Sequence, residues 1–263
     1  MTEHVIVTVE KRVQTIRFNR PEKKNALTPA MYAAAADALE NAIVRDDIGA
    51  TIILGSGGSF TAGNDLGDFA RSGTREAPKP GDPLPPVGRF LRAIALHPKP
   101  LLAGVDGLAI GVGVTMLLHC DFVVAAESAK FQTPFVNLGL VPEAASSLLL
   151  PRIAGYQRAA EILLFADMFG PKLGVEAGFV NRVVAVADLE PTVLKHAQAI
   201  AAKPPEAIRL AKSFMKGDLT AVVRQMDAES EVFGQRLGSA EAKEAFAAFF
   251  EKRPPDFAKL KTA

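Results

Sequence analysis

Two glycine-containing turns and one carboxylate are the features of this sequence whose residue types and spacing could do chemistry. The first turn is Phe60-Thr61-Ala62-Gly63-Asn64-Asp65-Leu66, the second is Gly107-Leu108-Ala109-Ile110-Gly111-Val112-Gly113, and each follows a short apolar segment. Peptide N–H groups at two such turns can converge on one oxygen atom and stabilise the negative charge that develops on a carbonyl oxygen. Glu143 lies thirty residues after Gly113, in a nearly uncharged stretch, and is a candidate general base. The pattern therefore predicts an enzyme that acts on an acyl group.

The composition limits the partners that such an enzyme could have. The chain has 263 residues, of which 49% are hydrophobic, which is enough for a large core. Its 30 basic and 29 acidic residues nearly cancel, so there is no general electrostatic attraction for nucleic acid or for a membrane surface. The N-terminus shows no basic segment followed by an apolar core, which favours a cytoplasmic protein. The longest uncharged run is too short and too rich in glycine to cross a membrane.

The elements that must position these residues alternate between strands and helices. Strands 5–10 and 13–18 flank Lys11-Arg12 and form a predicted hairpin, and Thr28-Pro29 caps a predicted helix that continues to about residue 44. Prolines between Ser72 and Pro86 indicate a surface loop. Further strands are expected at 50–54, 101–105, 122–126 and 131–132. Further helices are expected at 87–97, from the second glycine turn to about 118, at 219–236 and at 240–251. Three more helices should begin at about residues 144, 157 and 206. We therefore expect a layered α/β core over residues 1–200 and a helical C-terminal region over 201–263.

Over essentially its whole length, the sequence resembles the crotonase (enoyl-CoA hydratase/isomerase) superfamily. Four segments carry the resemblance: 19–27 (Asn-Arg-Pro-Glu-Lys-Lys-Asn-Ala-Leu), 60–66, 105–121 and 131–151. The resemblance implies an α/β fold, a spiral of ββα repeats with a C-terminal helical region used for oligomerisation. It also implies homotrimers, or dimers of trimers, that act on an acyl-CoA thioester. Coenzyme A is then part of the substrate, so no separate cofactor and no metal are expected.

The resemblance also assigns roles to individual residues. The backbone amides of Ala62 and Val112 would form the oxyanion hole for the thioester carbonyl, although many relatives have glycine where this chain has Val112. The residues expected to bind coenzyme A are Lys23, Ala26 and Leu27 of the first segment, Asp65 and Leu66 after the first turn, and Phe233 and Lys252 near the C-terminus. Phe233 could instead be part of an apolar helix face, and Lys252 a solvated helix end.

The reaction is indicated by the acids that this site lacks as well as by the one it has. Hydratases of the superfamily use two glutamates, and by the resemblance their positions hold Thr115 and Phe135, neither of which exchanges a proton near neutral pH. The run from 131 to 147 instead resembles the Δ3,Δ2-enoyl-CoA isomerase branch, in which a glutamate at the Glu143 position is the base, and Asn64 also fits this branch. Apolar neighbours would raise the pKa of this carboxyl.

The predicted reaction is a 1,3-proton shift that moves the double bond of a 3-enoyl-CoA to position 2. Glu143 would remove a proton from C2, the two amides would hold the dienolate oxygen, and the same carboxyl would return the proton at C4. Two alternatives stay open. One is a hydratase or other acyl-CoA lyase that uses Glu143 or Asp68 differently, and the other is a non-catalytic acyl-CoA-binding subunit in which Glu143 is an ordinary residue of a helix's first turn.

Overall fold

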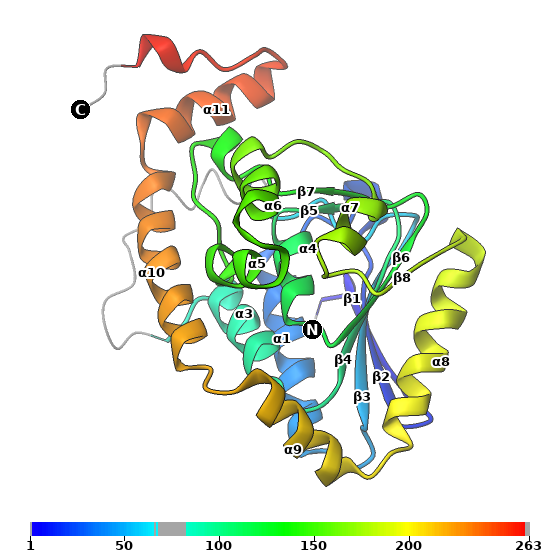
Figure 1. Cartoon of the computed structure of the whole chain (residues 1–263). Helices are drawn as coiled ribbons and strands as arrows, with labels where there is room; N and C mark the ends of the chain where they lie inside the picture. The colour runs from blue at the N-terminus through cyan, green and yellow to red at the C-terminus, as the bar shows by residue number, and fades with distance from the viewer. Residues whose placement is uncertain (1, 66, 68–82, 261–263) are drawn as a thin grey trace.

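A six-stranded sheet runs through the centre of the computed structural model, which describes residues 2–65, 67 and 83–260 (Figure 1). The strand order is β1-β2-β3-β4-β6-β8; β1 and β2 are antiparallel, and the other neighbours are parallel. The strands are β1 (Val5–Glu10), β2 (Val13–Phe18), β3 (Ala50–Gly55), β4 (Leu101–Val105), β6 (Phe122–Ala126) and β8 (Arg182–Val184). A second, parallel sheet pairs β5 (Leu108–Ile110) with β7 (Lys130–Gln132). Leu66, Asp68 and most of the expected loop up to Pro86 lie outside the described residues.

The helices follow the strands in the alternation that the sequence predicts. The α-helices are α1 (Pro29–Val44), α3 (Pro86–Leu96), α4 (Val112–Thr115), α5 (Ser146–Ala154), α6 (Tyr156–Ala160), α7 (Pro171–Glu176), α8 (Leu189–Ala201), α9 (Pro205–Lys216), α10 (Thr220–Leu237) and α11 (Ala240–Glu251). The short helices are η1 (Pro21–Lys23), η2 (Met116–His119), η3 (Val136–Leu138), the π-helical η4 (Glu161–Phe165), η5 (Val186–Asp188) and η6 (Phe257–Lys259).

Local signals explain the first elements. Lys11 and Arg12 both have positive φ, at 48° and 64°, which is the geometry of a tight hairpin turn that matches the twist of the strands. The side chain of Thr28 accepts a hydrogen bond from the Met31 amide and caps α1, and Pro29 occupies the first turn. The predicted boundaries of the hairpin and of α1 are therefore confirmed.

The large sheet separates two apolar cores because successive strand residues point to opposite faces. Ile52 and Leu54 of β3 pack with Leu189 and Val193 of α8 on one face. Ile53, between them in sequence, belongs to the larger core on the other face, which α1 and α3 help to form. Figure 1 shows α8 alone on its side of the sheet. The candidate catalytic turns lie on the other side, with the larger core.

Several elements were not expected from the sequence, among them β5, β8, α7 and α8. Strands β5 and β8 have three residues each, and α8 contains a proline in its first turn, so none gives a long periodic pattern. The helix expected from the second glycine turn to about 118 is α4 followed by the 3₁₀ helix η2.

The chain beyond Ala201 is helical and packs against the core. Helix α10 runs along the side of the molecule from α9 to α11 (Figure 1). Lys212 of α9 donates to the Asp121 carboxylate at 2.6 Å, and Phe233 of α10 packs against Phe135. None of the described helices is long and apolar enough to span a membrane.

Candidate active site

The two glycine turns lie side by side, as the sequence predicts. The Thr61 amide donates to the Leu108 carbonyl at 2.8 Å, and the Ile110 amide donates to the Thr61 carbonyl at 3.0 Å. Gly63 has a φ of 86°, and a Cβ atom at this position would lie 2.8 Å from the Ile110 carbonyl oxygen. A larger residue would force the turns apart, so glycine is required here.

The predicted amide of the first turn is not free. The Ala62 N–H donates to the Lys24 carbonyl at 2.8 Å, because residues 24–27 run alongside this turn. The expectation that Ala62 supplies an oxyanion donor is corrected on this ground. Two residues later, the Asn64 amide has no acceptor among the residues that the structure describes. Asn64 can therefore offer its N–H group to a ligand.

The amide of Val112 is available as expected. Val112 is the first residue of α4, where backbone N–H groups have no partner within the helix. Gly111 precedes it with φ of 55°, a conformation that glycine adopts readily, and donates its own amide to the Gln132 carbonyl at 2.8 Å. In the described part of the chain, no acceptor is found for Val112 N–H. Its isopropyl group is fully buried.

Glu143 is a buried carboxyl group. The residue is 7% exposed, and its Oε1 atom has no hydrogen-bond partner among the described residues. Burial, and secondly the negative charge of Glu229, raise the pKa of Glu143 to about 8. A buried acid of this kind can exchange a proton near neutral pH, as a general base must.

The backbone after Glu143 forms a left-handed turn. Ala144 and Ala145 have φ of 61° and 56°, which is unfavourable for residues with a Cβ atom. The His119 imidazole Nε2 lies 2.8 Å from the Ala144 carbonyl oxygen. Burial lowers the pKa of His119 to about 4, so the ring is neutral and donates this hydrogen bond.

Tyr32 of α1 binds the first turn and is affected by the charge of Glu143. Its hydroxyl donates to the Asn64 side-chain oxygen at 2.6 Å. Burial, and then the charge of Glu143, raise the pKa of Tyr32 well above its ordinary value. Because only a nearby charge acts in this way, the carboxyl of Glu143 and the Tyr32–Asn64 pair share one region of the molecule.

The two positions at which hydratases have glutamates are buried and hold no acid. Thr115 is fully buried at the end of α4, and no partner for its hydroxyl is found among the described residues. Phe135 is 4% exposed, and its ring lies 3.9 Å from the position that a Cβ atom at Gly111 would occupy. This ring therefore borders the second glycine turn.

The expected coenzyme A ligands fall into two groups. Ala26, Leu27 and Asp65 lie close together near the first turn, because the Leu27 amide donates to the Gly63 carbonyl at 2.8 Å. The Asp65 carboxylate also forms an ion pair with the Arg20 guanidinium, at an N–O distance of 2.7 Å. Lys23 is exposed on η1.

Toward the C-terminus, Phe233 is 9% exposed in an apolar cluster, with its ring centroid 6.4 Å from that of Phe135. Lys252 is exposed at the end of α11. Contacts of these residues with a nucleotide stay predictions, and Leu66 lies outside the described residues.

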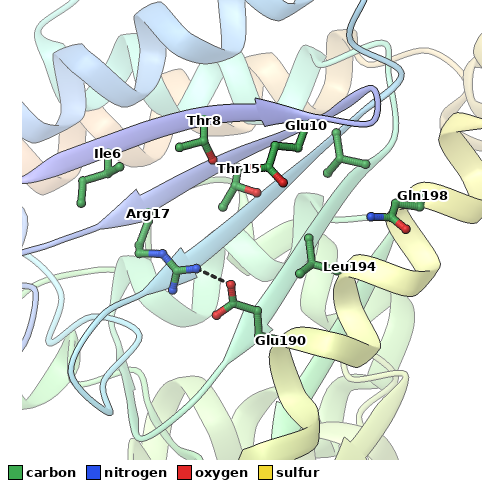
Figure 2. A pocket seen from close by; sticks show the side chains of 9 residues that line it. Ile6, Thr8, Glu10, Thr15, Arg17, Glu190, Leu194 and Gln198 are labelled. Atoms are coloured by element: carbon green, nitrogen blue, oxygen red, sulfur yellow. Dashed lines mark hydrogen bonds and ion pairs between the residues drawn. The ribbon is translucent and has the colours of Figure 1, made fainter.

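Away from this site, the described residues form further cavities. A polar cavity of about 270 Å³ lies between β1, β2 and α8 (Figure 2). Arg17 and Glu190 line this cavity and form an ion pair, in which a guanidinium nitrogen lies 2.6 Å from a carboxylate oxygen. A smaller cavity of about 130 Å³ shares these two residues. Both lie on the α8 side of the sheet, and none of the candidate catalytic residues lines them. No cluster of metal-ligating side chains is found in the described ranges.

Sequence reasoning missed Glu229 and Tyr32. Glu229 interrupts the buried stripe of α10 formed by Val222, Met226 and Phe233, at helical spacing. An acid at a core position of a helix is unusual and is a usable signal. Tyr32 is similarly the one polar aromatic residue among the buried residues of α1.

Comparison with known proteins places this geometry in a family. The family described as "Enoyl-CoA hydratase/isomerase" matches residues 8–260. A 1,2-epoxyphenylacetyl-CoA isomerase of Escherichia coli is 36% identical over 98% of this chain and 99% of its own. A crotonyl-CoA hydratase of Syntrophomonas wolfei is 35% identical over 97% of this chain and 98% of its own.

The fold is found in solved structures as well. An enoyl-CoA hydratase/isomerase from Pseudoalteromonas atlantica superimposes with a TM-score of 0.89 and 43% identity, covering 97% of this chain and all of that one. The expected crotonase-type α/β fold is thereby confirmed. The chain belongs to the enoyl-CoA hydratase/isomerase family, the crotonase superfamily.

Proposed function

We propose that this enzyme is an enoyl-CoA isomerase that shifts the double bond of a 3-enoyl-CoA to position 2. The proposal rests on the buried carboxyl of Glu143, whose Oε1 atom has no hydrogen-bond partner among the described residues and whose pKa is raised to about 8. Thr115 and Phe135 offer no second acid or base to activate a water molecule. One carboxylate is enough for a proton shift, whereas dedicated hydration loses a general-base contribution of roughly 10²- to 10⁴-fold without the two glutamates.

The reaction balances with one base. Glu143 takes the proton from C2, and the electron pair of that C–H bond moves into a dienolate over the thioester oxygen, C1, C2, C3 and C4. The dienolate then takes the proton back at C4, which leaves the double bond between C2 and C3. Two preorganised amides stabilise the charge on the thioester oxygen. We assign these donors to Asn64 and Val112, since the Ala62 amide is already bonded to Lys24.

We also propose that the substrate's coenzyme A portion lies near the segment 23–27 and the first turn, and that the chain assembles as a homotrimer or a dimer of trimers. Large apolar side chains are exposed on η4, α9 and α11, including Phe165 (71%), Phe214 (82%) and Met215 (87%). Exposed apolar surface of this kind is typical of an interface between subunits. Sedimentation at micromolar concentration should give a multiple of the chain mass, and a monomeric mass would contradict the assembly.

A direct comparison of substrates tests the reaction. The protein is incubated with a trans-3-enoyl-CoA and, separately, with crotonyl-CoA, and the consumption of each is followed. We expect isomerisation of the 3-enoyl thioester to exceed hydration greatly. Hydration at a comparable rate would support the alternative of a hydratase, and tight binding without turnover of either thioester would support a non-catalytic binding subunit.

A further inference from the structure

Helix α10 carries a buried acid that the proposed reaction does not use. Glu229 is 6% exposed and lies on the apolar stripe of α10, between Met226 and Phe233. Burying a carboxylate is unfavourable unless hydrogen bonds compensate for the lost water. The partners of Glu229 should therefore show what this acid does.

Three hydrogen-bond donors to Glu229 belong to the turn that follows Glu143. The Ala145 amide donates to Oε2 at 2.6 Å, the Ser147 amide donates to Oε1 at 3.1 Å, and the Ser147 hydroxyl donates to Oε1 as well. Gln225, one turn earlier on α10, donates to the Ser147 hydroxyl oxygen at 2.9 Å. Three donors converge on the two oxygens of Glu229. Burial raises the pKa of Glu229, and these hydrogen bonds oppose that shift because a carboxylate only accepts.

This carboxylate caps helix α5 from another helix. The residue at the N-cap position of α5 is Ala145, which has no side-chain acceptor for the first amides of that helix. Ala144 and Ala145 are both left-handed, and such a turn persists only when its surroundings hold it. Glu229 accepts from the amides on one side of the turn, and His119 donates to the Ala144 carbonyl on the other.

We propose that Glu229 is a positioning residue: it fixes the turn from Ala144 to Ser147 and thereby holds the side chain of Glu143 at the reacting carbon atoms. Its negative charge has a second effect, because a like charge opposes ionisation of Glu143. Among the described residues, Tyr32 feels the charge of Glu143 and His119 contacts the Ala144 carbonyl, and both groups are neutral near pH 7. Lys216 lies near His119, and burial lowers its pKa to about 8. No ion pair to Glu143 is found in the described part of the chain.

The role in catalysis rests on the proposed function, so the first measurement uses the protein alone. The carboxyl band of Glu143 is titrated by infrared difference spectroscopy and is assigned by its loss in Glu143→Gln. In Glu229→Gln, which keeps the shape and removes the charge, the midpoint should move to lower pH. An unchanged midpoint would overturn the proposal, whatever reaction the enzyme performs.

The second measurement is kinetic. Glu229→Gln should lower kcat for the 3-enoyl thioester by about tenfold or more, with KM within about twofold, because a misplaced base slows proton transfer more than it weakens binding. Glu231→Gln, an exposed acid of the same helix, is the control for charge and should behave like the wild type. Met226→Ala, at a buried apolar residue of α10, is the control for lost stability.

Two outcomes would contradict the positioning role. One is a wild-type kcat in Glu229→Gln, and the other is an equal loss of kcat in Met226→Ala at matched loss of Tm. If Glu229→Gln does not fold, Ser147→Ala removes one donor and keeps the backbone amide. It should then lower kcat severalfold with KM unchanged, and a wild-type kcat in Ser147→Ala would overturn the proposal.

Discussion

The Tyr32 hydroxyl donates a 2.6 Å hydrogen bond to the side-chain oxygen of Asn64, whose backbone amide has no acceptor among the described residues. Replacing Tyr32 by Phe keeps the ring beside Phe90 and removes this bond. A lost hydrogen bond of about 1 kcal/mol predicts a fall in kcat/KM of about three- to tenfold. Steady-state assays with the 3-enoyl thioester measure it. Tyr156→Phe, at the only other tyrosine, which is 68% exposed, should leave the rate unchanged; equal effects of the two changes would refute the role of Tyr32.

Proline at position 112 removes the second oxyanion donor with little damage to the fold. Val112 is the first residue of α4, and proline is tolerated there because this amide has no partner within a helix. We expect Val112→Pro to lower kcat by about a hundredfold or more. Val112→Ala retains the N–H group and should stay near the wild-type rate. A similar loss in both variants would point to the side chain instead of the amide.

The rate should rise with pH through the neutral range. Catalysis requires the carboxylate form of Glu143, whose pKa is raised to about 8, mainly by burial. The kcat/KM for the 3-enoyl thioester should therefore climb about tenfold per pH unit below that value and level off above it. A kcat/KM that does not change between about pH 6 and pH 8 would show that the base has the ordinary pKa of a glutamate.

Glu143 should also make the stability of the protein depend on pH. Below the ordinary value of 4.5, the carboxyl is protonated in both the folded and the unfolded chain. Between that value and about 8, the unfolded chain releases the proton and the folded chain keeps it, so the free energy of unfolding falls as pH rises. Glu143→Gln removes this loss and should be more stable than the wild type by up to about 3–5 kcal/mol near pH 9, with little difference near pH 4.

Thermal unfolding of the two proteins across this pH range measures the effect. The exposed substitution Glu231→Gln serves as the control and should track the wild type. Glu143→Gln could instead be less stable than the wild type at alkaline pH. That result would mean that the Glu143 carboxylate of the wild type has a compensating partner, contrary to the geometry described above.

Local signals in the sequence were enough to predict the hairpin, α1 and the convergence of the glycine turns. Lys11-Arg12 and Thr28-Pro29 act on neighbouring residues, and each glycine turn begins within a few residues of the end of a strand. The availability of a particular amide is not local: the Ala62 N–H is taken by Lys24 because of the register between two segments. Glu229 lies 84 residues from Ala145 along the chain, so only the packing of α10 could reveal that contact.

Glu143 is the proposed base of the reaction, and one substitution at this position tests that role. Glu143→Gln keeps the size of the side chain but cannot accept the C2 proton. We expect kcat for trans-3-enoyl-CoA to fall by roughly 10²- to 10⁴-fold, equivalent to about 3–5 kcal/mol of barrier, while calorimetry shows almost unchanged affinity for the 2-enoyl-CoA product. Asp68→Asn, the parallel change in the alternative acid, should have much less effect. Wild-type isomerisation by Glu143→Gln, with loss of activity in Asp68→Asn, would contradict the mechanism.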